Sequence, residues 1–157
     1  MYYGWKAKIG LIIPSTGSAP ERDFNRYAPD GVAIFTQRVP FEKVDHDGLS
    51  ALGDLVVEAS RLLASAEPDL LVFGCTTGSL IKGVGYDKEL IERIESASGI
   101  RAITTSTALL EALKALGAHK IVVSTPYSDS VNATEKQFLE DNGFEVLGIQ
   151  GLGYTDP

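Results

Sequence analysis

Short apolar runs alternate along the chain with segments in which apolar residues recur every three or four positions. The apolar runs predict strands over residues 8–13, 31–39, 69–74, 101–104, 120–124 and 144–149. The helical spacing predicts helices over residues 49–65, 87–98, 106–117 and 128–143. Several runs are apolar on both faces, which is typical of a sheet covered on two sides. The alternation implies right-handed crossovers, so we expect one flavodoxin-like α/β lobe with a parallel sheet and helices on both faces.

Four short loops rich in hydroxyl groups follow predicted strands. They are PSTGS (14–18), CTTGS (75–79), TSTA (105–108) and TPYSDSVN (125–132). Ligands of open parallel sheets bind beyond the carboxyl ends of the strands, so these loops are expected to converge on one rim. Hydroxyl and backbone N–H donors beside helix N-termini suit a small anion. For any single loop, helix capping explains the same residues.

Cys75 is the only cysteine in the chain, and it ends the apolar run of "LLVFGCTTGS". A thiol between a strand and a following helix is expected to have a lowered pKa, and the thiolate is the nucleophilic form. A free cysteine is also a common small residue of protein cores. Its position in the pattern leaves both interpretations open.

Composition excludes several other classes. The net charge is −7 and no cluster of Lys or Arg is longer than a pair, so we expect no nucleic-acid partner. No segment approaches the ~20 apolar residues that span a bilayer, and we expect no membrane association. One cysteine without a partner indicates a reducing compartment, hence a cytoplasmic protein. His46 and His119 lie far apart in the sequence, so no metal site is predicted.

Three motifs in order carry a family resemblance: "GLIIPSTGSAPERDFNRYAP", "VFGCTTGS" and "ALGAHKIVVSTPYSDSVN". With them the chain, from about residue 8 onward, resembles the aspartate/glutamate racemase superfamily. It looks most like the branch of maleate cis–trans isomerases, arylmalonate decarboxylases and ectoine-utilisation proteins. The resemblance implies two similar α/β lobes with the active site between them, no metal or organic cofactor, and assembly into a homo-oligomer.

The resemblance also implies roles for single residues. Cys75 matches the first-lobe cysteine that acts as nucleophile or proton-transfer base. Thr76 and Thr77 match positions that hold a substrate carboxylate, Tyr127 matches a tyrosine that hydrogen-bonds a carboxylate, and Asn132 supports the Tyr127 loop. The wall of the pocket formed by the first loop corresponds to Pro14, Ser15 and Thr16.

The function implied is a cofactor-independent isomerase or racemase of a small carboxylate or dicarboxylate, acting through a cysteine thiolate and an enediolate. A decarboxylase of substituted malonates and a non-catalytic carboxylate-binding module are the alternatives. The motifs fit no branch fully. Gly17 stands at a position where maleate isomerases usually carry asparagine. Thr76 stands at a position where amino-acid racemases typically carry asparagine. Arylmalonate decarboxylases lack a cysteine at the place of Cys75.

The end of the sequence falls where the family passes into its second lobe. We therefore expect residues 1–157 to be the N-terminal lobe of a longer protein whose second lobe carries a second cysteine. A one-lobed relative completed by a partner chain is the alternative. Residues 35–48 are expected to form a loop over the pocket, in which Val39, Phe41 and Val44 either line an apolar side or serve surface packing.

Overall fold

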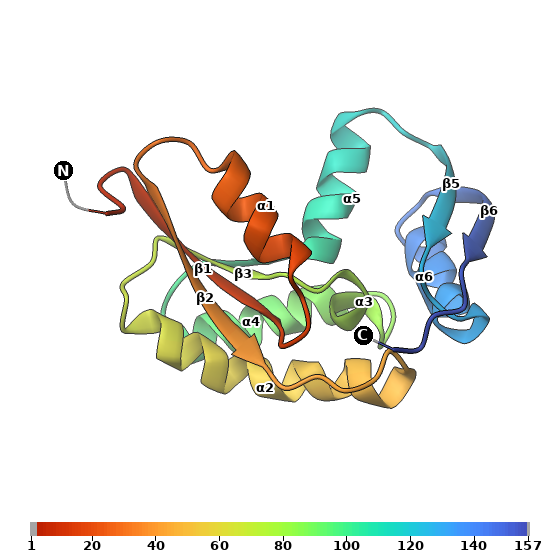
Figure 1. Ribbon diagram of the computed structural model, residues 1–157. Coiled ribbons are helices and arrows are strands. Elements are labelled where there is room, and N and C mark those ends of the chain that lie inside the picture. Colours follow the sequence, from red (N-terminus) through yellow and green to blue (C-terminus); the bar gives the residue numbers. More distant parts are fainter. Residues whose placement is uncertain (1–2, 157) are drawn as a thin grey trace.

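The computed structural model describes residues 3–156, and its main body is a parallel sheet of four strands (Figure 1). The strands are β1 (Ala7–Pro14), β2 (Val32–Val39), β3 (Leu70–Phe73) and β4 (Ala102–Thr104). Their order is β2-β1-β3-β4. The chain therefore turns to opposite sides after β1 and after β3, which is the flavodoxin-like switch point. The predicted fold class is confirmed.

Helices cover both faces of this sheet. The helix α1 (Ala19–Tyr27) lies on one face, and α2 (His46–Ala64) and α4 (Tyr86–Ser98) lie on the other (Figure 1). The short α3 (Thr76–Leu80) starts after two residues that follow β3, and the longer α5 (Thr105–Ala115) starts directly after β4. Both therefore begin at the carboxyl edge of the sheet, where a ligand site is expected.

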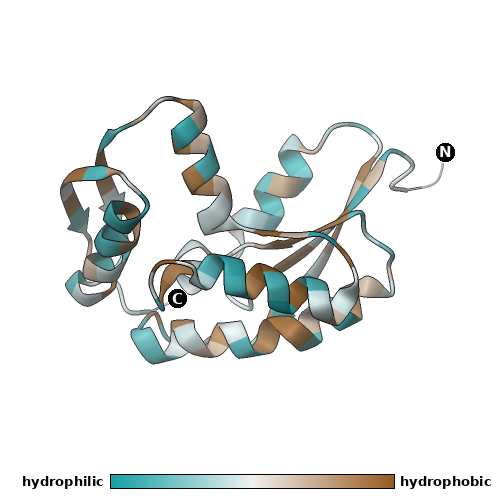
Figure 2. Cartoon of the chain, turned by 180° about the vertical axis from the view of Figure 1, so that it is seen from behind, coloured by the Kyte–Doolittle hydropathy of each residue, from teal (hydrophilic) through white to brown (hydrophobic). Residues whose placement is uncertain are grey.

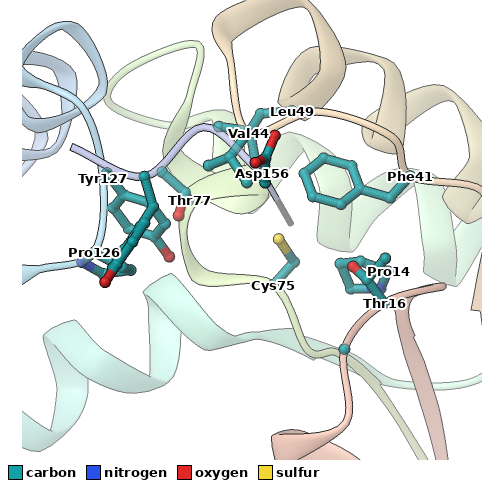
Figure 3. Close-up of a pocket in the computed structure, with 12 residues that line it drawn as sticks. Pro14, Thr16, Phe41, Val44, Leu49, Cys75, Thr77, Pro126, Tyr127 and Asp156 are labelled. Atoms are coloured by element: carbon teal, nitrogen blue, oxygen red, sulfur yellow. The ribbon is translucent and has the colours of Figure 1, made fainter. Parts of the chain in front are cut away.

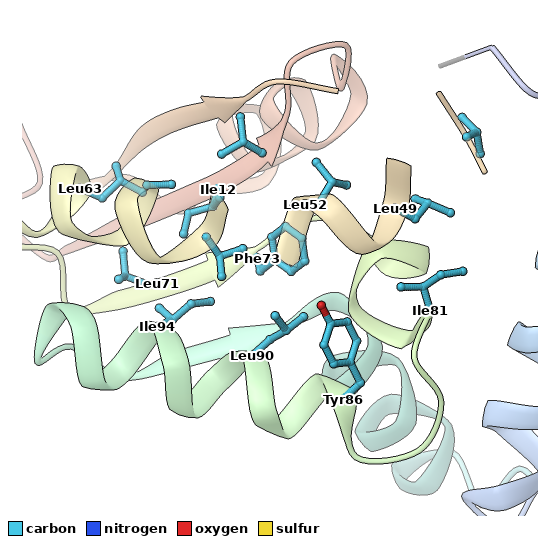
Figure 4. Packing of buried hydrophobic residues seen from close by; sticks show 14 of the residues in the cluster. Ile12, Leu49, Leu52, Leu63, Leu71, Phe73, Ile81, Tyr86, Leu90 and Ile94 are labelled. Atoms are coloured by element: carbon cyan, nitrogen blue, oxygen red, sulfur yellow. The ribbon is translucent and has the colours of Figure 1, made fainter. Parts of the chain in front are cut away.

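The core follows from the alternation of side chains along the strands. Ile12, Leu71 and Phe73 point toward α2 and α4 and form the larger buried cluster with Leu52 and Leu90 (Figure 4). The alternate positions of the same strands form a second cluster under α1. The central strands are accordingly apolar over most of their length, whereas the helices alternate apolar and polar faces (Figure 2).

The last two strands form a sheet of their own. β5 (Lys120–Thr125) and β6 (Glu145–Gly151) pair in parallel, and α6 (Asp129–Asp141) packs against them through Phe138 and Leu139. On the face of this small sheet that α6 does not cover, Val122 and Leu147 are 75% and 60% exposed. The sequence pattern predicts both strands and the helix, but apolar periodicity does not say which strands pair.

Two helices were not predicted. Helix α1 buries none of its residues fully, and its sequence has too few apolar residues to mark a core helix. Helix α3 occupies most of the expected CTTGS loop. The segment 35–48 is only partly a loop, because β2 runs to Val39 and α2 begins at His46. In the described part of the chain, no helix is long and apolar enough to cross a membrane.

Candidate active site

A cavity of about 320 Å³ lies at the carboxyl edge of the sheet, at the switch point between β1 and β3 (Figure 3). Its wall comes from the segments after β1, β2, β3, β5 and β6, including the first turns of α2 and α3. The lining residues are Pro14, Thr16, Gly17, Phe41, Val44, Leu49, Cys75, Thr77, Pro126, Tyr127, Tyr154 and Asp156. Figure 3 shows the sulfur of Cys75 pointing into this space, with Phe41 and Pro14 on one side and Thr77 and Tyr127 on the other.

Five of the eight sequence-predicted site residues line the cavity. They are Pro14, Thr16, Cys75, Thr77 and Tyr127. These five residues end or follow three strands, β1, β3 and β5, so segments far apart in the sequence contribute to one space. The other three predicted residues do not line the cavity: Ser15, Thr76 and Asn132. Their side chains or carbonyls instead hold the loops that do.

The first loop is a tight turn held from β2. The Gly17 N–H donates to the Pro14 carbonyl at 2.9 Å, which closes the turn. Arg38 donates to the carbonyls of Ser15 and Gly17 at 2.8 and 3.2 Å, and it forms an ion pair with Glu21 of α1. Ser15 therefore holds the first loop in place without lining the cavity itself.

The hydroxyl of Ser15 connects this loop to the next one. Its Oγ accepts from the Phe41 N–H at 3.1 Å, and this bond joins the loops that follow β1 and β2. Phe41 and Val44 line the apolar side of the cavity together with Leu49. Val39, which we expected beside them, is buried in the larger core cluster. The expectation of an apolar wall is thus met by Phe41 and Val44 and is wrong for Val39.

Cys75 has an extended backbone and stands immediately before α3. The Gly78 N–H donates to its sulfur, and a side chain at Gly78 would crowd that sulfur, since a Cβ there would lie 2.9 Å from it. Burial nevertheless dominates and raises the pKa of the Cys75 thiol to about 11. The expected lowering of this pKa is wrong for the chain as described, because the low-polarity surroundings outweigh the single N–H donor.

Tyr127 is fixed from its own loop and from across the cavity. Its N–H donates to the Thr125 Oγ1 at 3.1 Å, and the Thr125 hydroxyl donates to the Asn132 Oδ1 at 2.6 Å. The Tyr127 hydroxyl is hydrogen-bonded with the Thr77 side chain, while burial raises the pKa of the phenol. Asn132 therefore supports the Tyr127 loop in this geometry, and the phenol is a neutral hydrogen-bonding group.

The residues that sequence reasoning missed come mainly from the end of the described chain. After β6 the chain folds back across the site, where the Tyr154 N–H donates to the Pro126 carbonyl at 2.8 Å. The Val44 N–H donates to the Thr155 carbonyl at 3.0 Å, which brings Asp156 to the cavity. No local signal in "GYTDP" marks this long-range return, so only the three-dimensional structure could find it.

The charged groups are unevenly distributed over the lining of the cavity. Among its lining residues there is no Lys or Arg, and Asp156 contributes a carboxylate. An anion bound here would depend on the hydroxyls of Thr77, Tyr127 and Thr16 and on backbone N–H groups. A second carboxylate placed near Asp156 would be repelled, whereas the side formed by Phe41, Val44 and Leu49 suits an apolar substituent.

Glu135 is a buried acid beside the site. It lies on α6 with 6% of its surface exposed, its Oε2 has no hydrogen-bond partner among the described residues, and its charge acts on Tyr127. Burial raises the pKa of this carboxyl above its ordinary value of 4.5. The folded protein therefore favours the protonated form, and deprotonation costs stability.

We expect Glu135→Gln to stabilise the protein in a manner that depends on pH. Below pH ~4.5 both the folded and the unfolded chain hold the proton, so the variant and the parent melt alike. As pH rises through the folded-state pKa, the free energy of unfolding of the parent falls, whereas that of the Gln variant does not change. We expect a gain of about 1 kcal/mol at pH 8, or a few degrees in Tm, because an unpaired buried charge is removed. Thermal melts at pH 4 and pH 8 measure it.

Glu140→Gln is the matched control for this effect. Glu140 lies on the same helix, is exposed and pairs with Lys136 at 3.7 Å, so its loss changes stability little at either pH. A Glu135→Gln protein that melts below the parent at pH 8 would contradict the assignment of an unpaired, buried carboxyl with a raised pKa.

A family model and related sequences confirm the predicted membership of the Asp/Glu racemase superfamily. Within it, the chain belongs to the arylmalonate decarboxylase family, whose model matches residues 9–156. The arylmalonate decarboxylase of Bordetella bronchiseptica is 28% identical over 147 residues, covering 94% of this chain. A maleate isomerase of Pseudomonas putida is 24% identical over 161 residues, covering 95% of this chain.

Solved structures of maleate isomerases and arylmalonate decarboxylases share the fold. A maleate isomerase variant from Pseudomonas putida S16 with maleate has a TM-score of 0.89 at 22% identity. It covers 96% of this chain and 65% of its own. A mutant arylmalonate decarboxylase in a liganded form has a TM-score of 0.88 at 29% identity, with 96% and 64% covered. The chain spans 61% and 64% of the length of the two curated relatives.

Proposed function

We propose that this chain is one cysteine-bearing part of a cofactor-independent isomerase or racemase that acts on a small carboxylate. The observation that carries the proposal is the convergence of one thiol and two hydrogen-bonding hydroxyls on one cavity. Cys75 supplies the thiol, and Thr77 and Tyr127 supply the hydroxyls from the opposite wall. This combination places a nucleophile or base beside donors for a carboxylate whose charge increases during reaction.

In the isomerase reaction the sulfur of Cys75 adds to one alkene carbon of a cis-enedioate. The π electron pair moves onto the neighbouring carboxylate and gives an enediolate. The thiol proton passes to a water molecule as the S–C bond forms and returns to the sulfur when the sulfur is expelled. Rotation about the new single bond precedes return of the electron pair, which reforms the alkene and expels the sulfur. Thr77 and Tyr127 would donate to the enediolate oxygens. A Nocardia farcinica maleate cis–trans isomerase mutant carries a covalently bound succinylcysteine intermediate, which supports this route by analogy.

In the racemase reaction Cys75 removes the proton next to a carboxylate, and a second group returns a proton to the other face. The described cavity offers one thiol, so this route needs a further acid. We propose that the chain is the N-terminal lobe of a longer protein whose second lobe supplies it. The relatives, which are about half as long again as the part matched here, support that proposal.

A decarboxylase of substituted malonates is the second candidate, and the apolar wall favours it. Phe41, Val44 and Leu49 form a side of the cavity without charged groups. A carboxylate held there is poorly solvated, whereas departing carbon dioxide is neutral, so release lowers the electrostatic cost. The enediolate left behind would be stabilised by the same donors and then protonated. The family match to arylmalonate decarboxylase points the same way.

One NMR experiment in D2O separates these reactions. The natural gene product, its intact mass first compared with the 16.8 kDa of this chain, is incubated with maleate, a chiral 2-arylpropionate, an amino acid and phenylmalonate. Isomerisation converts the cis-enedioate without loss of carbon. Racemisation incorporates deuterium at the α-carbon with no carbon dioxide, and decarboxylation releases carbon dioxide while incorporating deuterium.

The outcome assigns the class. Turnover of any of these compounds that also requires Cys75 supports the proposal and selects the branch. Binding of the same carboxylates without turnover by a full-length protein would overturn it and assign a non-catalytic binding module. A measured mass of 16.8 kDa in an active enzyme would instead remove the proposed second lobe.

A further inference from the structure

Two buried serines meet beneath the loop that carries Cys75. Ser79 of α3 and Ser106 of α5 have no exposed surface, and their hydroxyl oxygens lie 2.7 Å apart. Each hydroxyl also lies 2.8 Å from the carbonyl oxygen of Thr76. The Ser106 N–H donates to the Ser79 hydroxyl at 3.3 Å. Four polar groups, two hydroxyls, a carbonyl and an N–H, thus bond to one another in a place where an unpaired one would be costly.

The Thr76 carbonyl receives more hydrogen bonds than the capping of a short helix requires. A serine that bonds the carbonyl three residues before it, as Ser79 does, is a common local feature. Ser106 instead comes from the first turn of α5, 30 residues along the chain from Thr76. The second hydroxyl therefore ties the segment after β4 to the segment after β3. Figure 1 shows α3 and α5 beginning beside each other at this edge.

Holding the Thr76 carbonyl fixes the groups that face the cavity. The peptide between Thr76 and Thr77 is planar and trans, so the direction of its oxygen sets the direction of the Thr77 N–H. Thr77 lines the cavity and is hydrogen-bonded with Tyr127. The next N–H, that of Gly78, donates to the Cys75 sulfur. Thr76 itself does not line the cavity, and its carbonyl is the point at which the serines act.

We infer that Ser79 and Ser106 are positioning residues, which hold the Thr76 peptide so that Cys75 and Thr77 keep their orientation toward the cavity. Nothing in either side chain touches the cavity, so each acts only through Thr76. The expected effect of these serines on turnover rests on the proposed function. Their expected effect on the order of the Thr76–Gly78 segment does not. The two can therefore be tested separately.

Ser106→Ala tests the inference in the full-length protein. We expect amide hydrogen exchange at Thr77 and Gly78, followed by NMR, to accelerate at least about tenfold, because the loop opens locally. Exchange in the β1 and β3 amides should stay unchanged. With a substrate that the parent protein converts, the KM of Ser106→Ala should rise several-fold and its kcat should fall about tenfold. A loss of this size is typical of misplaced reacting groups. Ser106→Thr, which keeps the hydroxyl, should restore both readouts in large part.

Ser60→Ala is the matched control, because Ser60 is also without exposed surface and donates to the Val57 carbonyl at 2.7 Å, within α2. Ser79→Ala is the second variant and should reproduce Ser106→Ala. Exchange at Thr77 and Gly78 that matches Ser60→Ala in both variants would overturn the inference. Global unfolding of both would do so too, since it would assign a structural role. Faster exchange in a protein that turns over nothing would leave the inference standing and remove the proposed function.

Discussion

Replacing Cys75 with serine is expected to abolish turnover, by on the order of 10⁴-fold or more, while leaving the fold intact. The sulfur points into the cavity and is the one thiol of the chain, whereas a serine hydroxyl at neutral pH is neither a comparable nucleophile nor a base. Serine is close to cysteine in size, so we expect the melting temperature to change by only a few degrees. The D2O assay and a thermal melt measure the two effects.

The thiol itself should respond to pH in a way that fits its environment. With a pKa of about 11, only on the order of one thiol in 10⁴ is ionised at pH 7. Alkylation by iodoacetamide should therefore be slow at pH 7 and accelerate about tenfold per pH unit toward pH 11. A rate that is already maximal near pH 7 in the full-length protein would mean that parts beyond the described residues lower this pKa. Unchanged turnover in Cys75→Ser would exclude Cys75 as nucleophile.

The fold was largely readable from the sequence because burial on both faces of a parallel sheet leaves a strong local signal. All six strands and four helices correspond to predicted segments, with boundaries within about three residues. Helix α1 was missed because it packs through few side chains, chiefly Phe24, and exposes most of its surface. The separate pairing of β5 with β6 was missed because strand pairing is a non-local property that periodicity does not contain.

The residues of the site likewise fall into those that the sequence could predict and those that it could not. Residues at strand ends, such as Pro14 and Cys75, were predictable because topology alone brings those ends together. Tyr154 and Asp156 were not, because they reach the cavity only through backbone hydrogen bonds to loops over 25 and 100 residues earlier in the chain. The pKa of Cys75 was misjudged for a related reason. Its desolvation comes from burial against the larger core cluster, whose members lie mostly on other elements.

The geometry of the Tyr127 loop leads to a second large expected effect, at Gly151. This residue ends β6, pairs with Thr125 of β5, and has no room for a side chain. A Cβ there would overlap the carbonyl oxygen of Tyr127 and the amide nitrogen of Asn132. One of the two obstacles is backbone, which cannot rotate away as the end of a flexible side chain can.

Gly151→Ala is therefore expected to destabilise the protein by about 1–3 kcal/mol, the usual cost of overpacking. At this chain length that corresponds to a fall in Tm of roughly 2–4 °C for each kcal/mol. The displaced Tyr127 carbonyl also moves the phenol relative to Thr77, so KM for the carboxylate substrate should rise. Thermal melts and steady-state kinetics at one pH measure both effects on the same preparation.

Gly148→Ala on the same strand isolates the cause. Gly148 is half-buried like Gly151, yet a Cβ built there meets nothing within 4 Å. Alanine should be neutral or slightly stabilising at this position, by up to about 1 kcal/mol, because it restricts the unfolded chain. If both variants lost the same stability, the strand would be sensitive to any side chain. A loss confined to Gly151→Ala instead means that close backbone contact between β6 and the Tyr127 loop sets the position of the phenol.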